Sequence, residues 1–180
     1  MDKSAFLKRR EYRVDITAGL YHLTKPQGNL DSVDVLMKIL LEKKLIGSTT
    51  NGGYICGQTP AVCFQDIPLY SVAQNVYYEQ ELQNQHGAKI RYEGTGLAFG
   101  KFFIYKNGGR PVVYDKLDDA KRYLPADQWW RIVNLDLASD KLIDWTHERE
   151  WRVPGNLTFE LHVRLLGSRC FCFAMRVNGF

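Results

Sequence analysis

The chain has 180 residues, of which 45% are hydrophobic and 13% aromatic. This length and composition predict one folded domain with a packed core and exclude a mainly disordered chain. The net charge of +4 is mildly basic, as expected of a protein that binds phosphate groups. No apolar run reaches the roughly 18 residues that a membrane-spanning helix needs, and the N-terminus does not resemble a secretory signal. We therefore expect a cytoplasmic protein without a membrane partner.

The first half of the chain predicts a strand, a helix, a strand and a second helix. Residues 16–24 favour a strand, and Asp31 is a good N-cap for a helix that runs to about Lys44. Residues 46–60 are rich in Gly, Ser, Thr and Asn, which is typical of a loop. A short apolar strand is expected at 61–64. The helix that follows it is expected at about 69–82.

The second half predicts short elements. Strands are expected near 94–99 and 111–114, with the aromatic segment 102–105 between them. Helical pieces are expected near 116–123 and 126–134. The last third returns to strands, expected at 150–153, 158–163 and 170–177. This order is neither the regular alternation of a Rossmann fold nor an all-β sandwich, so it predicts an α+β fold, and the sequence contains neither of the common phosphate-binding glycine motifs.

The four cysteines do not suggest a metal or disulfide framework. Cys56 and Cys63 are separated by six residues, and Cys170 and Cys172 by one, and neither spacing matches the usual zinc knuckle. In a cytosolic chain, small buried apolar side chains are the commoner role for such residues. We therefore predict no metal site.

Three short motifs carry the functional hypothesis. The first is His22-Leu23-Thr24 at a strand end, followed by a helix. The second is Phe64 near the end of a strand, with Ser71 seven residues later in the next helix. The third is Glu150 at the start of a late strand, preceded two residues earlier by Glu148. A lone histidine is usually structural and a lone carboxylate is usually solvated, so these motifs indicate a function only when all three are taken together.

Taken together, these motifs resemble those of the diphtheria-toxin-like ADP-ribosyltransferases, including the DarT type that modifies DNA. They are also similar to bacterial abortive-infection proteins of the AbiG type, some of which are described as antitoxins. The resemblance covers residues of about 20–80 and 145–153. It implies a single domain over residues 1–180 with an ADP-ribosyltransferase-like split β-sandwich and peripheral helices. It also implies NAD as the substrate.

The resemblance assigns roles to several residues. Glu150 would be catalytic, because a carboxylate stabilises the positive charge that develops on the ribose when nicotinamide leaves. His22 would hydrogen-bond a ribose hydroxyl as part of the catalytic set, and Thr24 would contact the adenosine side. Ser71 would bond the nicotinamide amide or brace the glutamate, and Phe64 would lie at the cofactor site.

Two other positions leave alternatives open. The stacking tyrosine of the family's second motif falls on Cys63 here, and Tyr70, Tyr77 or Tyr78 could replace it. Arg149 or Arg152 could bind the pyrophosphate, while an ion pair of Arg152 with Glu150 or with another acidic residue is an equally weighted alternative.

Two groups of side chains have a functional and a structural interpretation each. Glu148 and Glu150 are similar to the Glu-x-Glu pair of arginine-modifying toxins, and in one strand both carboxylates would face the same substrate. Trp129 and Trp130 could stack on bases of a single strand, although aromatics at helical spacing are more often core residues.

Three functions follow from the resemblance. The leading one is an NAD-dependent ADP-ribosyltransferase that modifies DNA or RNA bases, or protein, in phage defence or a toxin–antitoxin system. The second is NAD hydrolysis by a defence effector. The third is a non-catalytic module that binds a nucleotide or a toxin or antitoxin protein; the loss of the second-motif tyrosine favours this one.

Overall fold

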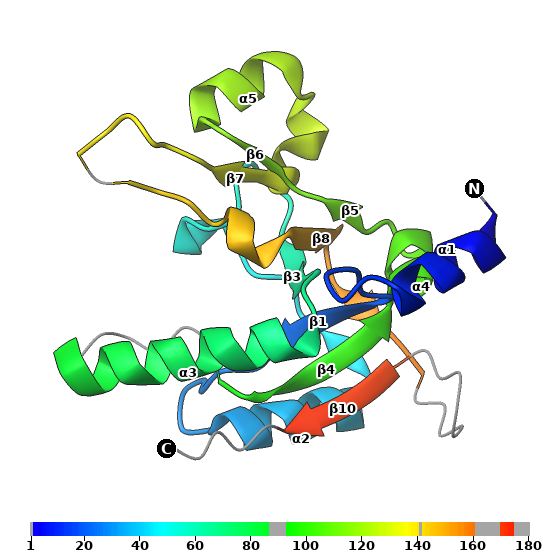
Figure 1. Ribbon diagram of the computed structural model, residues 1–180. Coiled ribbons are helices and arrows are strands. Elements are labelled where there is room, and N and C mark those ends of the chain that lie inside the picture. The colour runs from blue at the N-terminus through cyan, green and yellow to red at the C-terminus, as the bar shows by residue number, and fades with distance from the viewer. Residues whose placement is uncertain (1, 87–92, 141, 161–169, 175–180) are drawn as a thin grey trace. The chain divides into compact units, whose positions relative to one another are not determined.

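The computed structural model describes residues 2–86, 93–140, 142–160 and 170–174 (Figure 1). The chain divides into two compact units, each assembled from separate stretches of sequence. Unit 1 comprises Met1–Lys43, Ile67–Lys101 and Leu161–Phe180, and unit 2 comprises Lys44–Asp66 and Phe102–Glu160. Both units combine helices with antiparallel strand pairs, which confirms the predicted α+β class. The single domain over residues 1–180 stays a prediction.

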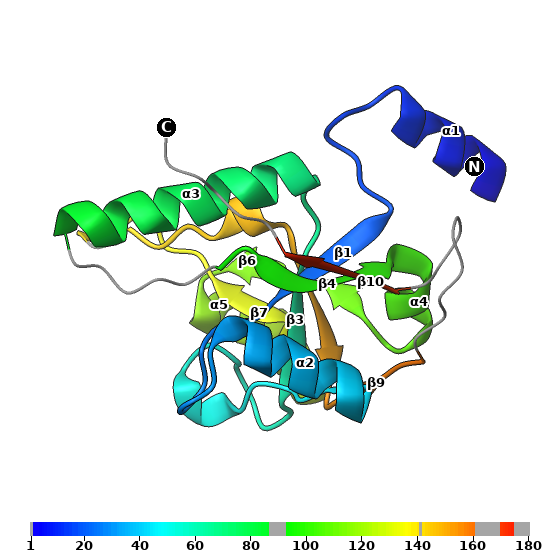
Figure 2. The ribbon, with the colours of Figure 1, turned by 90° about the horizontal axis from the view of Figure 1, so that it is seen from below.

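Unit 1 contains an antiparallel strand arrangement with β4 in the middle. Strand β4 (Thr95–Gly100) pairs with β1 (Gly19–Leu23) on one side and with β10 (Cys170–Ala174) on the other. The helices of this unit are α1 (Lys3–Glu11), α2 (Ser32–Glu42) and α3 (Leu69–His86). Helix α2 packs against β4, and Figure 2 shows α2 on one side of the strands and α3 on the other.

Helix α2 begins where its capping residue predicts. The Asp31 carboxylate accepts hydrogen bonds from the backbone N–H groups of Val33 and Asp34, both at 2.8 Å. These bonds satisfy donors that have no partner inside the helix, and the expected N-cap is confirmed. Leu36 is buried at 3% exposure. The helix ends at Lys43, which adopts a left-handed backbone conformation with φ of 50°.

Helix α3 extends beyond its predicted end to His86 and has 18 residues. Val72, Val76 and Glu79 recur at helical spacing and are buried, so this stripe is the helix face turned toward the core of the unit. The other faces are largely polar. Neither this helix nor any other in the described part of the chain is both long enough and apolar enough to cross a membrane.

Unit 2 is organised around β8 (Glu150–Pro154). This strand pairs antiparallel with β3 (Ala61–Gln65) and with β5 (Arg110–Pro111). Two smaller strand pairs lie in the same unit: antiparallel β2 (Lys44–Leu45) with β9 (Leu157–Thr158), and parallel β6 (Val113–Asp115) with β7 (Ile132–Asn134). The helical elements are α4 (Lys101–Lys106), α5 (Leu117–Tyr123) and the 3-10 helices η1 (Thr50–Gly52), η2 (Ala126–Arg131) and η3 (Thr146–Glu148).

The pairing of β3 with β8 gives this strand pair one apolar and one polar face. Cys63 lies opposite Arg152, and Gln65 lies opposite Glu150. Because residues directly opposite in an antiparallel pair share a face, these four side chains are on the same face. The residues between them, exemplified by Phe64 at 1% exposure, form the apolar face.

Some predicted elements differ from the structure or reach beyond the residues that it describes. Residues 126–134 were expected to be helical, but the helix η2 ends at Arg131 and β7 follows. Ile132 and Val133 are β-branched and buried, and they pair with β6, so tertiary pairing decides the conformation there. Of the strand predicted at 158–163, only Thr158 lies in a strand, β9; residues 159 and 160 are not in a strand, and residues 161–163 lie outside the described residues, as do residues 175–177 of the strand predicted at 170–177.

Candidate functional site

A buried ion pair between Glu150 and Arg152 forms the centre of the polar face in unit 2. Arg152 Nε lies 2.8 Å from Glu150 Oε1, and Arg152 Nη2 lies 3.2 Å from Oε2. The two residues are 7% and 3% exposed. Burial is the largest single effect and lowers the pKa of Arg152, but Glu150 and Cys63 act in the opposite direction, and together they raise the pKa above its ordinary value. The guanidinium therefore stays charged beside a fixed carboxylate.

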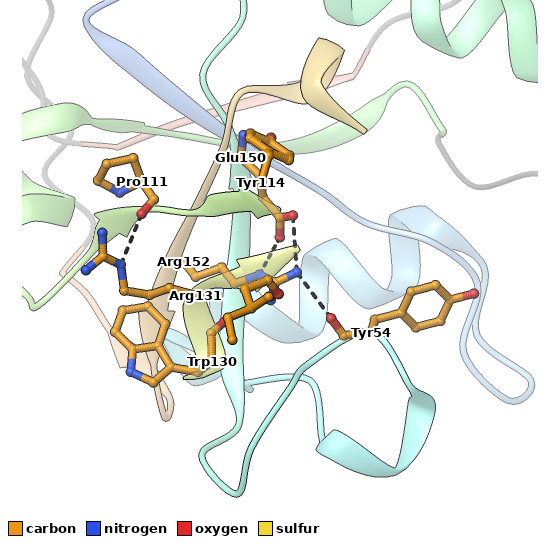
Figure 3. A network of polar contacts seen from close by, with 8 residues as sticks. Tyr54, Pro111, Tyr114, Trp130, Arg131, Glu150 and Arg152 are labelled. Carbon is orange, nitrogen blue, oxygen red and sulfur yellow. Dashed lines mark hydrogen bonds and ion pairs between the residues drawn. The ribbon is translucent and has the colours of Figure 1, made fainter. Parts of the chain in front are cut away.

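The Arg152 guanidinium also binds three backbone carbonyls (Figure 3). Its Nη1 donates to Trp130 O at 2.8 Å and to Ile132 O at 3.1 Å, and its Nη2 donates to Tyr54 O at 3.2 Å. With the two bonds to Glu150, five hydrogen bonds match the five N–H donors of the side chain. Of the two alternatives for Arg152, the ion pair is the one observed. A pyrophosphate contact would require some of these bonds to break.

A sharp change of backbone direction places Glu150 at the start of β8. Glu148 ends the helix η3, and Arg149 then adopts a left-handed conformation with φ of 45°, which is uncommon for a residue with a side chain. The backbone N–H of Asp66 bonds to the carbonyls of Glu148 and Arg149, and Trp151 Nε1 donates to Asp66 Oδ2 at 3.2 Å. These contacts hold the turn in place.

The expectation that Glu148 and Glu150 share one face of one strand is therefore wrong, because only Glu150 belongs to β8. Strand alternation does not apply across a left-handed residue. The charge of Glu148 nevertheless raises the pKa of the Cys63 thiol, as the charge of Glu150 does more strongly.

Tyr114 contacts Glu150 from the side of β6. The backbone N–H of Glu150 donates to the Tyr114 hydroxyl oxygen at 2.7 Å. Burial raises the pKa of Tyr114 to about 12; the N–H bond opposes this shift and the Glu150 charge adds to it. The hydroxyl is thus protonated at neutral pH. Its proton makes no hydrogen bond to any residue that the structure describes.

Cys63 occupies the position that holds a stacking tyrosine in the ADP-ribosyltransferases whose motifs this sequence resembles. Its half-buried thiol lies opposite Arg152 and packs with Ile55 and Trp130. Burial raises the pKa of this thiol well above its ordinary value; Glu150 raises it further, and Arg152 opposes the shift. A cysteine has no aromatic ring that could stack on nicotinamide. Its thiol is also a poor nucleophile while it is protonated.

We expect Cys63 to react slowly with iodoacetamide in the folded protein. Because the raised pKa depletes the thiolate tenfold for each unit, its alkylation at pH 8 should be at least about tenfold slower than in urea. Peptide mapping after timed quenching measures this rate, and Cys56 in the same sample reports general access. Equal rates in the folded and unfolded chain would show that Cys63 is an accessible thiolate.

Gln65 is a feature of the site that the sequence motif contains but does not explain. It lies directly opposite Glu150 and is 6% exposed. Its side-chain oxygen Oε1 is buried and has no hydrogen-bond partner within the described chain. Buried polar atoms are nearly always paired, so this atom requires an explanation. No sequence signal distinguishes Gln65 or Tyr114, because both gain their importance from tertiary contacts.

Unit 1 holds four of the predicted site residues. His22 lies on β1 and is partly exposed, and Ser71 lies in the first turn of α3. Tyr77 is 40% exposed on the same helix. Thr24 is buried, and its hydroxyl contacts the backbone carbonyls of Ser32 at 2.9 Å and Thr95 at 3.1 Å. Thr24 therefore joins the end of β1 to α2 and β4.

Three predicted aromatic positions take part in packing. Phe64 is 1% exposed and faces away from Glu150, so the structure places it in the apolar core of unit 2. Trp130 is 4% exposed and packs with Ile55. Trp129 donates from Nε1 to Leu124 O at 3.0 Å. For Trp130 the core interpretation is confirmed.

The other four predicted residues, Glu148, Glu150, Phe64 and Arg152, lie in unit 2. There the structure brings Glu150 and Arg152 into contact and adds Tyr114 to them. The combination of His22 with Glu150 in one site stays a prediction. No group of three or more metal-binding side chains is found among the described residues. Comparisons with family models, with curated proteins and with solved structures find no match for this chain.

Proposed function

We propose that this protein is an NAD-dependent ADP-ribosyltransferase that modifies nucleic acid bases, or protein, in phage defence or a toxin–antitoxin system. The observation that carries the proposal is the fixed Glu150 carboxylate at the start of β8, on the same strand face as Cys63 and Gln65. The motif resemblance requires a glutamate at this position. Preorganised charge of this kind is the largest contribution that most enzymes make to catalysis.

The reaction breaks the bond between the nicotinamide nitrogen and C1′ of the ribose. Nicotinamide leaves with the bonding electron pair, and positive charge develops on the ribose, where the Glu150 carboxylate stabilises it. A nitrogen or oxygen of the acceptor then bonds to C1′ and releases its proton to a carboxylate or to water. If water is the acceptor, the same steps give NAD hydrolysis.

The pairing of Glu150 with Arg152 also favours a second function. Both carboxylate oxygens accept hydrogen bonds from the guanidinium, which offsets part of the negative charge that the reaction would use. A non-catalytic module needs no such charge. We therefore retain the binding module, an antitoxin or sensor that holds a nucleotide or a partner protein, as the competing proposal.

The test is nicotinamide release from NAD by the purified protein, alone and with single-stranded DNA, RNA or protein lysate. We expect release that depends on nucleic acid, with ADP-ribose attached to its bases. Release without an acceptor would identify a hydrolase. If NAD raises the melting temperature but no nicotinamide is released under any condition, the binding module is the better account.

A further inference from the structure

Gln65 presents an acceptor atom that the protein leaves without a donor. The residue ends β3 opposite Glu150, is 6% exposed, and its Oε1 has no partner within the described chain. A buried acceptor without a donor costs free energy, and folded proteins tolerate such atoms mainly where a ligand or a water supplies the missing donor.

Tyr114 presents a donor on the other side of Glu150. Its hydroxyl oxygen accepts the backbone N–H of Glu150, and its own proton makes no hydrogen bond within the described part of the chain. Its raised pKa keeps that proton in place at neutral pH. Glu150 is thus flanked by an unused acceptor from β3 and an unused donor from β6.

A primary carboxamide has the complementary groups, because its NH₂ donates and its C=O accepts. We propose that Gln65 and Tyr114 bind the carboxamide of nicotinamide, so that the glycosidic bond is cleaved beside Glu150. This inference rests on the proposed use of NAD. It makes Gln65 a specificity-determining residue that selects the amide over the corresponding acid.

The selection follows from the charges and donors of the site. Nicotinic acid is a carboxylate at neutral pH and has no N–H to offer Gln65, while its negative charge faces Glu150. Arg152, the cation paired with Glu150, has its N–H donors engaged by Glu150 and three carbonyls. Sites built to hydrogen-bond a group discriminate strongly against an analogue that lacks it.

The experiment compares cleavage of NAD with cleavage of nicotinic acid adenine dinucleotide, in the presence of the best acceptor. For the wild type we expect kcat/KM to be at least about a hundredfold higher with NAD. In Gln65→Leu the preference should fall to less than about tenfold, mainly through a higher KM for NAD. Gln74→Leu, at an exposed position of α3, is the matched control and should keep the wild-type preference. Tyr114→Phe should lower the preference as well.

Each result decides one claim. The inference is overturned if the wild type cleaves both dinucleotides equally, or if Gln65→Leu keeps the wild-type preference. The proposal that the protein is a transferase would then still stand, and a buried water would supply the hydrogen bond to Gln65 Oε1. If neither dinucleotide is cleaved, the transferase is refuted, and melting-temperature shifts with free nicotinamide and nicotinic acid decide the inference. A shift with nicotinamide alone that Gln65→Leu abolishes sustains it, and any other pattern overturns it.

Discussion

Replacing Arg152 by methionine is expected to lower the free energy of unfolding by about 3–5 kcal/mol. The change removes the cation facing Glu150 and the donors to three backbone carbonyls, at a residue that is 3% exposed. Methionine has a similar length and is apolar, so the substitution leaves only a small cavity. The decrease in the free energy of unfolding therefore arises mainly from the lost charge and hydrogen bonds. Urea unfolding followed by tryptophan fluorescence measures this free energy.

Arg122→Met is the matched control for this experiment. The Arg122 side chain is 78% exposed and pairs with Asp119 at 3.0 Å on the surface of α5. Exposed ion pairs contribute little, so we expect a change within about 0.5 kcal/mol. If Arg152→Met and Arg122→Met unfold at the same urea concentration as the wild type, the buried network does not hold unit 2 together.

The second large effect concerns removal of the whole ion pair. The double variant Glu150→Met/Arg152→Met is expected to be more stable than Arg152→Met by about 2–4 kcal/mol, because no unpaired charge is left in the interior. It should remain below the wild type, since the carbonyls of Tyr54, Trp130 and Ile132 lose their donors. The same urea series gives the coupling energy of the pair.

A double variant that is less stable than Arg152→Met would contradict this account. In that case Glu150 would stabilise the fold through partners other than Arg152. The comparison matters for function as well, because a variant without the carboxylate is informative about catalysis only if it folds. Replacing Glu150 alone leaves the buried Arg152 guanidinium without its carboxylate partner, which destabilises the fold. The double variant is therefore the better protein in which to measure the effect of the carboxylate on catalysis.

Local signals in the sequence were sufficient for several elements of the fold. Asp31 with the apolar spacing of residues 33–40 predicts α2, and the short apolar run 61–64 predicts β3 within one residue. In such segments capping, periodicity and burial agree. Where they conflict, tertiary pairing decides, as at Ile132 and Val133, which leave a helical segment to pair with β6.

The candidate site was less predictable, because its chemistry depends on register and backbone direction. The sequence identifies Glu150 as the start of β8, but only the pairing of β3 with β8 shows which residues face it. The left-handed conformation of Arg149 separates Glu148 from the strand, and no local pattern at a non-glycine residue predicts this. The unpaired oxygen of Gln65 likewise depends on all its neighbours together.

We propose that the Glu150 carboxylate promotes the cleavage of NAD by stabilising the positive charge that develops on the ribose. The most direct measurement is nicotinamide release from NAD by the wild type and by Glu150→Met/Arg152→Met, with nucleic acid present and at a temperature where both are folded. We predict release by the wild type and a rate at least about a hundredfold lower in the double variant. Equal rates in the two proteins would contradict the claim, because the folded variant has no carboxylate at this position.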